Sequence, residues 1–206
     1  MKKQSGFTLI ELAIVLVIIG LLLGGVLKGQ ELITQAKIKN VINDFNGLSA
    51  GIYSYKDRYN FFPGDDGGAS SRWSGGTTSG NKNGSVEGTY NSATAADESR
   101  LFWQHLRFAG FIAGATSETN QPLNAAGGQL GVQTGALGLS GLVICSANLP
   151  SKIANAVDSQ MDDGNATTGT VRGILQSGSN DTVTTAVGTE NYIDNGSNLY
   201  VICKNI

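Results

Sequence analysis

One carboxylate lies inside a long apolar run near the start of the chain. The sequence begins MKKQSGFTLIELAIVLVIIGLLLGGVLKG, and Glu11 is the only acidic residue between Phe7 and Leu27. An ionisable group at membrane depth costs at least about 2.5 to 3.5 kcal/mol, so it persists mainly where a partner or a role offsets that cost. Glu11 is therefore the first candidate functional residue, with ion pairing in a low dielectric as its chemistry. The alternative is a carboxylate near the membrane interface that extends into the lipid headgroups.

A serine motif further along could support nucleophilic catalysis. The residues GLSAG around Ser49 match Gly-x-Ser-x-Gly, the nucleophile-elbow pattern of hydrolases. That pattern needs a strand before the serine, whereas the residues before Ser49 have helical periodicity. A catalytic triad would also need His105, the only histidine, to reach Ser49 with an acid behind it. We therefore predict no catalytic residues and no enzymatic activity.

Two acidic clusters could offer oxygen ligands to calcium. Asp162, Asp163 and Asn165 lie in MDDGNATTG, and Asp65 and Asp66 lie in PGDDGG. Neither cluster follows the EF-hand spacing, and tight turns stabilised by Asp and Asn side chains explain both more simply. We predict no metal and no cofactor, with calcium at Asp162, Asp163 and Asn165 kept as the alternative.

The composition argues against a nucleic-acid partner. The net charge is −2, the pI is near 5.3, and the Lys and Arg residues form no block. Glycine is abundant, at 29 of 206 residues, and it occurs with Ser, Thr and Asn in long stretches. Much of the chain is therefore expected to be loop.

The apolar run must form the element that positions Glu11. Residues 7–27 match the ~20 residues that a helix needs to cross a bilayer. Lys2 and Lys3 precede this run, so the positive-inside rule predicts a cytoplasmic N-terminus and an extracytoplasmic location after Lys28. A secretory signal peptide would have a shorter apolar core and a small-residue cleavage site after it. The run is therefore expected to stay on the protein as a membrane anchor.

The short basic leader, the residues GFTLIE and the long apolar helix together resemble the class III signal of type IV pilins and of type II secretion pseudopilins. The resemblance implies that prepilin peptidase cuts between Gly6 and Phe7, and that the new amine of Phe7 is methylated. It also implies a role for Glu11 in assembly. The carboxylate of one subunit can face the Phe7 amine of its neighbour, and such a pair in a low dielectric can set the axial register of a filament.

The resemblance implies a structural function, that of a pilin or minor pilin in a type IV pilus-like filament. The implied partners are identical or related pilin subunits, prepilin peptidase/methyltransferase and an inner-membrane assembly platform. The subunit would cross the inner membrane once before assembly and lie in a cell-surface or periplasmic filament afterwards. One alternative is a pseudopilin of a type II secretion system. A more distant alternative is a membrane-anchored binding module or enzyme in which GFTLIE is coincidental.

The helical pattern continues beyond the apolar run. Apolar residues recur at intervals of three and four up to Tyr59, which predicts one helix over residues 7–59 whose second half, about 30–59, is amphipathic. The helix is expected to end before FFPGDD, because Pro63 lacks a donor and Gly64 favours a turn. This organisation predicts a leader at 1–6, a transmembrane and filament-core helix at 7–29, and an extracytoplasmic head at 30–206.

The remaining residues predict an α+β head, in which a small antiparallel sheet packs on the long helix and long Gly/Ser-rich loops connect the elements, as in type IV pilins. Trp103 and His105 belong to one expected helix, and they are more typical of core and boundary positions than of ligands. Asn195-Gly196 predicts a hairpin between two apolar runs. The expected elements are surface loop 64–96, helix 97–112, a mostly irregular segment 114–138, strands at 139–147, 168–175 and 199–203, and a short helix at 150–161.

The two cysteines, Cys145 and Cys203, each end a Val-Ile-Cys run. They are therefore expected to lie on neighbouring strands, and an extracytoplasmic location favours a disulfide between them. The resemblance to pilins, many of which have a C-terminal disulfide, points the same way. Two buried free thiols are the alternative.

Overall fold

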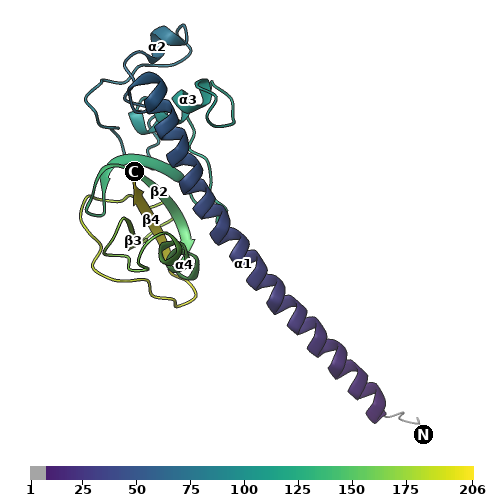
Figure 1. The fold of residues 1–206 in the computed structure, drawn as a ribbon. Coiled ribbons are helices and arrows are strands. Elements are labelled where there is room, and N and C mark those ends of the chain that lie inside the picture. Colours follow the sequence, from purple (N-terminus) through teal and green to yellow (C-terminus); the bar gives the residue numbers. More distant parts are fainter. Residues whose placement is uncertain (1–7) are drawn as a thin grey trace. The chain divides into compact units, whose positions relative to one another are not determined.

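Helix α1 runs from Leu9 to Tyr59 in the computed structural model, which describes residues 8–206 (Figure 1). It ends where Asn60 adopts a left-handed conformation with φ of 61° and donates its N–H to the Lys56 carbonyl at 2.8 Å. The helix thus ends before FFPGDD, as the sequence predicts. The chain divides into two units, Met1–Lys37 and Ile38–Ile206, and α1 contributes residues to both. The second is called the globular unit.

Within the globular unit, α1 presents one apolar face to the core. The buried positions recur every three or four residues, which places them on one side of the helix. They are Ile38, Val41, Phe45, Leu48, Gly51, Ile52 and Tyr55. This face confirms the amphipathic second half of the helix.

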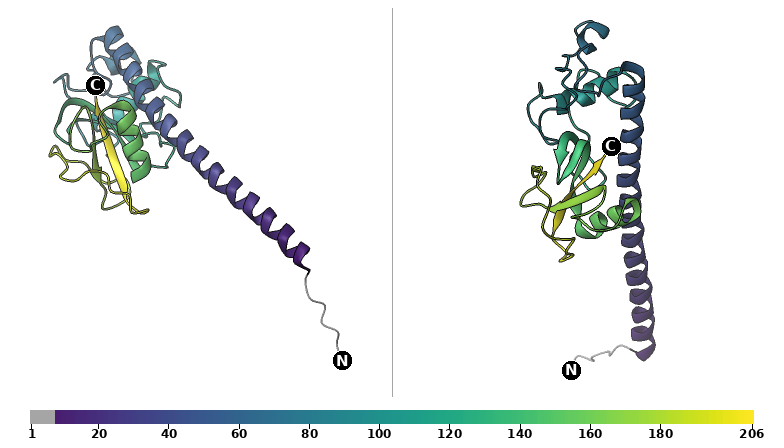
Figure 2. Two further views of the ribbon diagram at one scale, coloured as in Figure 1. Left: turned by 60° about the horizontal axis from the view of Figure 1, so that its bottom comes forward. Right: turned by 60° about the vertical axis from the view of Figure 1, so that its left-hand side comes forward.

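A four-stranded antiparallel sheet forms the other main layer of the globular unit (Figure 2). Its strands are β1 (Leu130–Ala136), β2 (Leu139–Pro150), β3 (Val171–Leu175) and β4 (Leu199–Asn205), in the spatial order β1-β2-β4-β3. The long helix and this sheet confirm the predicted α+β class.

The sheet is buried on both faces, which explains why β2 is a nearly continuous apolar run. Alternate side chains of a strand point to opposite faces. Leu142 and Ile144 belong to the cluster that contains the buried face of α1. Val143 and Cys145 belong to a second cluster, which includes Val183 from the long segment before β4.

Three further helices complete the globular unit: α2 (Ala69–Arg72), α3 (Glu98–Phe108) and α4 (Ser151–Met161). Helix α3 is the most buried of the three. Trp103 and His105 belong to it, and each has no more than 1% of its surface exposed. It ends earlier than residue 112 because Gly110 takes a positive φ of 76°. Helix α4 begins directly after Pro150, as predicted.

One expectation about the sheet is incomplete and another is wrong. Segment 114–138, predicted to be mostly irregular, also contains strand β1, because the sequence LGVQTGA has weak strand character and its pairing with β2 decides the structure. The expected hairpin at Asn195-Gly196 is absent: residues 191–198 belong to no strand, and 195–197 form a bend. Strand β4 already pairs with β2 on one edge and β3 on the other, so neither edge is open to another strand.

The prediction of a surface loop over residues 64–96 is only partly correct. The segment includes helix α2, and several of its side chains are fully buried, among them Asp66, Val86 and Tyr90. The segment also crosses β1 closely. A Cβ at Gly131 would lie 2.0 Å from the Tyr90 carbonyl oxygen, so only glycine permits this approach.

Candidate functional site

The carboxylate of Glu11 closes a capping box at the start of α1. Glu11 Oε2 accepts hydrogen bonds from the backbone N–H of Thr8 at 2.7 Å and from the Thr8 hydroxyl at 2.8 Å. The Thr8 hydroxyl oxygen in turn accepts the backbone N–H of Glu11 at 3.3 Å. These reciprocal contacts satisfy helix N–H groups that otherwise lack acceptors. Within one chain, Glu11 therefore stabilises its own helix start.

The helix surface after Glu11 is apolar on every side. All Val, Leu and Ile side chains from Leu9 to Leu27 have between 46% and 88% of their surface exposed within the chain. By length and composition this part of α1 can cross a membrane. The first ion pair after the apolar run is Lys28 with Glu31, at 2.8 Å. An all-round apolar helix of this kind needs lipid or other helices around it.

The predicted processing residues, Gly6 and Phe7, lie outside the described residues. Glu11 is described, but its predicted partner is the amine of another copy, so the single chain leaves that contact untested. Sequence reasoning missed Thr8. The signal was present as Thr-x-x-Glu before an apolar run, which is the pattern of a capping box.

The residues of the apparent hydrolase motif make structural contacts. Ser49 lies within α1 and donates its hydroxyl to the Phe45 carbonyl at 2.7 Å. His105 accepts the Gly64 N–H at Nδ1, at 3.0 Å, and its Nε2 lies 2.9 Å from the Thr78 carbonyl. These partners require the hydrogen to be on Nε2. Burial lowers the pKa of His105, so the ring is a neutral link between two backbone segments.

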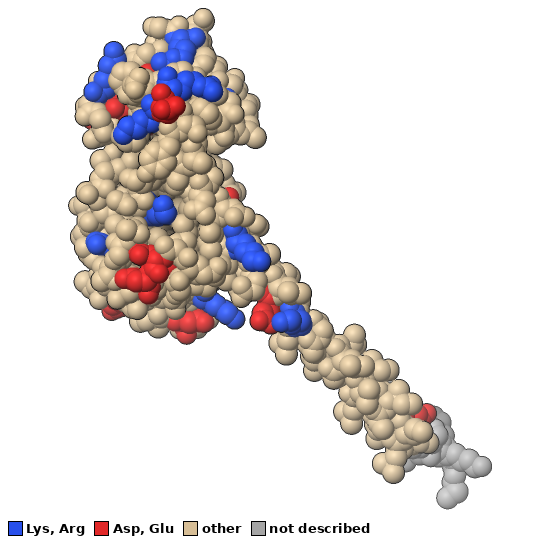
Figure 3. Space-filling view, in the orientation of Figure 1, with Lys and Arg blue, Asp and Glu red and all other residues tan. Residues whose placement is uncertain are grey.

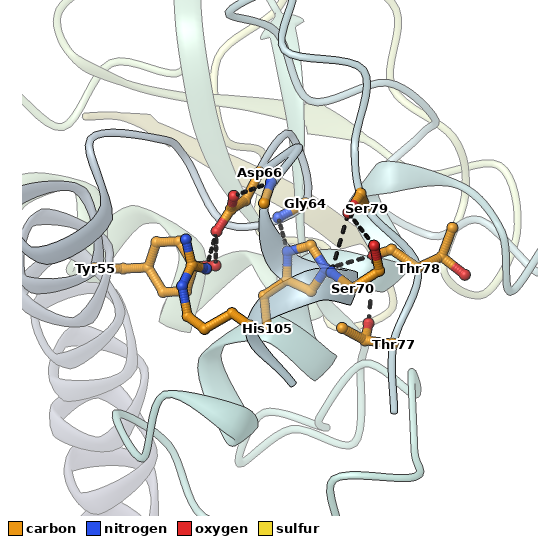
Figure 4. A network of polar contacts seen from close by, with 10 residues as sticks. Tyr55, Gly64, Asp66, Ser70, Thr77, Thr78, Ser79 and His105 are labelled. Carbon is orange, nitrogen blue, oxygen red and sulfur yellow. Dashed lines mark hydrogen bonds and ion pairs between the residues drawn. The ribbon is translucent and has the colours of Figure 1, made fainter. Parts of the chain in front are cut away.

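A buried polar network joins the end of α1 to segment 64–96 (Figure 4). The carboxylate of Asp66, which is fully buried, accepts the Tyr55 hydroxyl at 2.6 Å and pairs with the Arg72 guanidinium. It also accepts the backbone N–H of Gly68 at 2.7 Å. Burial alone would raise the pKa of Asp66, but the hydrogen bonds from Arg72, Tyr55 and Gly68 outweigh it and hold the pKa below its usual value. Asp66 therefore fixes a loop, and so does Asp65, which accepts the N–H groups of residues 83 and 84.

The calcium candidates also stabilise turns. Asp162 accepts the N–H groups of Thr170 and Val171, and Asp163 accepts the N–H of Asn165 and the Thr168 hydroxyl. Asn165 accepts the N–H and the hydroxyl of residue 167. Carboxylate oxygens of Asp162 and Asp163 lie within 4.8 Å of one another and of Asp158, a residue that the sequence reasoning did not include. These contacts fit the interpretation as turns, and calcium binding stays an untested alternative.

The two cysteines form a disulfide between neighbouring strands. Cys145 of β2 and Cys203 of β4 are direct partners in the sheet register, and their sulfur atoms are bonded. Both side chains are fully buried in the cluster on the sheet face away from α1. The bond closes a separation of 58 residues, which includes α4 and β3.

Residues 1–27 match a known family, described as the prokaryotic N-terminal methylation motif. No curated protein and no solved structure matches the chain. The match supports the resemblance to type IV pilins and pseudopilins, and it indicates processing by prepilin peptidase. Because it ends at residue 27, the globular unit is known from its own structure alone.

Proposed function

We propose that this chain is a structural subunit, a pilin or minor pilin, of a type IV pilus-like filament. In this proposal the precursor is cut after Gly6, methylated on Phe7 and held in the inner membrane by α1 until assembly. The observation that carries the proposal is the methylation motif at residues 1–27, together with the part of α1 within it, from Leu9 to Leu27, which is apolar on all sides except at Glu11.

The position of Glu11 within the apolar run supports a role in assembly. In the single chain its carboxylate already has two donors from Thr8, which offset part of the cost of placing a charge near lipid. Cleavage creates a cationic amine at Phe7, one residue before Thr8. In a staggered bundle of helices, the Glu11 carboxylate of one subunit pairs with this amine on the next, and a wrong register leaves both charges unpaired.

A pseudopilin of a type II secretion system is the alternative within the same family resemblance. It would share the motif, the helix and Glu11, so the two proposals differ in where the filament is found. Filaments at the cell surface favour a pilus. Subunits that stay in the cell envelope, together with loss of protein secretion on gene deletion, favour a pseudopilus.

The first test is the mass of the native protein, combined with electron microscopy of material sheared from cells. We expect a chain that begins at Phe7 and carries a methyl group, present in filaments. Gly6→Leu should prevent cleavage and leave the leader, residues 1–6, on the protein. The control Gln4→Ala should be cleaved normally. Native protein that retains residues 1–6 would overturn the proposal.

A further inference from the structure

Exposed cations gather over one end of the globular unit, the end that carries α2 and α3 (Figure 3). Lys56 and Arg58 come from the last turn of α1, and Arg72 is the last residue of α2. The side chains of Lys56 and Arg58 form no hydrogen bond or ion pair with any described residue. Of the three, only Arg72 has an acidic partner there, Asp66.

Aromatic rings hold these cations in place. Lys56 Nζ lies 4.1 Å from the centroid of the Phe62 ring, Arg58 Cζ lies 4.9 Å from that of Phe111, and Arg72 Cζ lies 4.0 Å from that of Tyr59. The rings are half-buried, and three of them pack together: Tyr59 lies edge-on to Trp73, and Trp73 stacks on Phe108 at 5.2 Å. The basic–aromatic face consists of Lys56, Arg58, Tyr59, Phe62, Arg72, Trp73, Phe108 and Phe111.

This face has the composition of a protein interface. Aromatic residues and arginine are enriched at the centres of such interfaces, where they supply most of the binding free energy. A cation already positioned over a ring also loses less side-chain freedom on binding. The partner that fits is a protein surface that presents carboxylates.

Acidic side chains gather towards the other end of the globular unit, where α4 lies (Figures 1 and 3). Asp158, Asp162 and Asp163 approach within 4.8 Å at their oxygens, and Asp163 is exposed. Asp158 is fully buried, so only Asp162, which is half-buried, and Asp163 reach the surface, and these two residues are called the acidic turn. Like charges at this spacing repel, so a cation brought by a partner is favoured there.

A polar filament requires two different surfaces at opposite ends of each subunit, because its contacts are head-to-tail and not two-fold. The globular unit has such a pair: the basic–aromatic face, where three cations outnumber the exposed carboxylate of Asp57, and the acidic turn. We propose that the basic–aromatic face of one subunit binds the acidic turn of a second copy of this chain. The proposal rests on the filament function above and adds the contact between globular units.

A charge exchange in the full chain, produced with its own assembly machinery, tests the contact. Arg58→Glu and Asp163→Lys should each lower the amount of subunit in sheared filaments by about tenfold, because each places like charges in the interface. The double variant restores opposite charges, and its yield should return to within about threefold of wild type. Glu118→Lys also replaces an exposed acidic residue with lysine, but it lies outside both surfaces. This variant is the control for Asp163→Lys and should assemble normally.

Several outcomes would overturn the contact while leaving the filament function intact. The first is a wild-type amount of filament for both single variants, and the second is a double variant that assembles no better than the single variants. The third is a lower amount of filament with Arg58→Glu but not with Asp163→Lys, which would indicate a different acidic partner. If Arg58→Glu lowers the melting temperature, Lys56→Glu replaces it. A wild-type chain that never enters filaments would overturn both proposals. The mass of the native protein, which shows whether the chain begins at Phe7, distinguishes failure of the filament function from failure of this contact alone.

Discussion

The hydroxyl of Tyr55 donates a 2.6 Å hydrogen bond to the buried carboxylate of Asp66, eleven residues further along the chain. Tyr55 belongs to the last turns of α1, and Asp66 lies in the segment that turns back towards α3. The same carboxylate pairs with Arg72 at the end of α2. One acidic side chain therefore fixes the path of the chain as it leaves the long helix.

Replacing Tyr55 with Phe should lower the free energy of unfolding by about 1 to 3 kcal/mol, because the buried carboxylate of Asp66 loses a donor. Thermal unfolding of the full chain in detergent, followed by near-ultraviolet circular dichroism, measures this change. Tyr53→Phe is the matched control, since Tyr53 is 56% exposed and should tolerate the loss of its hydroxyl. Equal melting temperatures for the two variants would contradict a stabilising role for the Tyr55–Asp66 bond.

Asp66 should also make stability depend on acid pH. Its pKa is lower in the folded chain than in the unfolded chain, so the unfolded state binds the proton more readily. The stabilisation is present above the unfolded value, near pH 4, and is lost as the pH falls through the folded pKa. Between about pH 5 and pH 3, wild type should therefore lose more stability than Asp66→Asn. Parallel curves for the two proteins would show that another group controls the acid transition.

Variants at Glu11 and Thr8 separate helix capping from subunit pairing. Glu11→Gln keeps an oxygen that can accept the Thr8 N–H but removes the charge, whereas Thr8→Val removes the hydroxyl and keeps the charge. We expect Glu11→Gln to abolish filaments, because the Phe7 amine of the neighbour is left unpaired. Thr8→Val should cost only about 1 kcal/mol of helix stability and retain filaments. Normal assembly of Glu11→Gln would mean that no ion pair sets the register.

Removing the disulfide should destabilise the globular unit without altering the apolar first half of α1. The double variant Cys145→Ala, Cys203→Ala is expected to lose about 2 to 5 kcal/mol of unfolding free energy. Thermal unfolding with and without reductant measures the loss. As a check on the bond itself, the denatured wild-type chain should react with a thiol reagent only after reduction, and reaction without reduction would contradict the disulfide.

Chelation of calcium should leave the melting temperature of the full chain unchanged within about 1 °C. Asp162 and Asp163 already accept hydrogen bonds from N–H and hydroxyl groups. A bound calcium ion would have to displace these donors from the carboxylate oxygens. The measurement is a melting curve in EDTA and in millimolar calcium, with magnesium as the control. A rise in melting temperature that is specific to calcium and disappears in Asp163→Asn would support the calcium alternative.

Local patterns in the sequence were sufficient for the elements that carry their own signals. The apolar run and the three- and four-residue spacing predicted α1, because helix burial has a short, regular period. Strands β2, β3 and β4 were predicted because they are short apolar runs, and the two Val-Ile-Cys runs placed Cys145 beside Cys203. The Gly-Phe junction and the spacing to Glu11 were likewise recognisable without any structure.

Tertiary structure decided what depends on long-range contacts. Strand β1 exists because β2 offers it an edge, and Asn195-Gly196 forms no hairpin because both edges of β4 are occupied. The burial of Asp66 inside a Gly/Ser-rich segment could not be predicted, because its partner Tyr55 lies 11 residues earlier in the chain. A core or boundary position was predicted for His105, but its contact with Gly64, 41 residues away, was not. The sequence by itself determined the apolar N-terminal helix and the methylation motif. Packing alone decided which polar residues became buried links and which charges stayed exposed at the two ends of the globular unit.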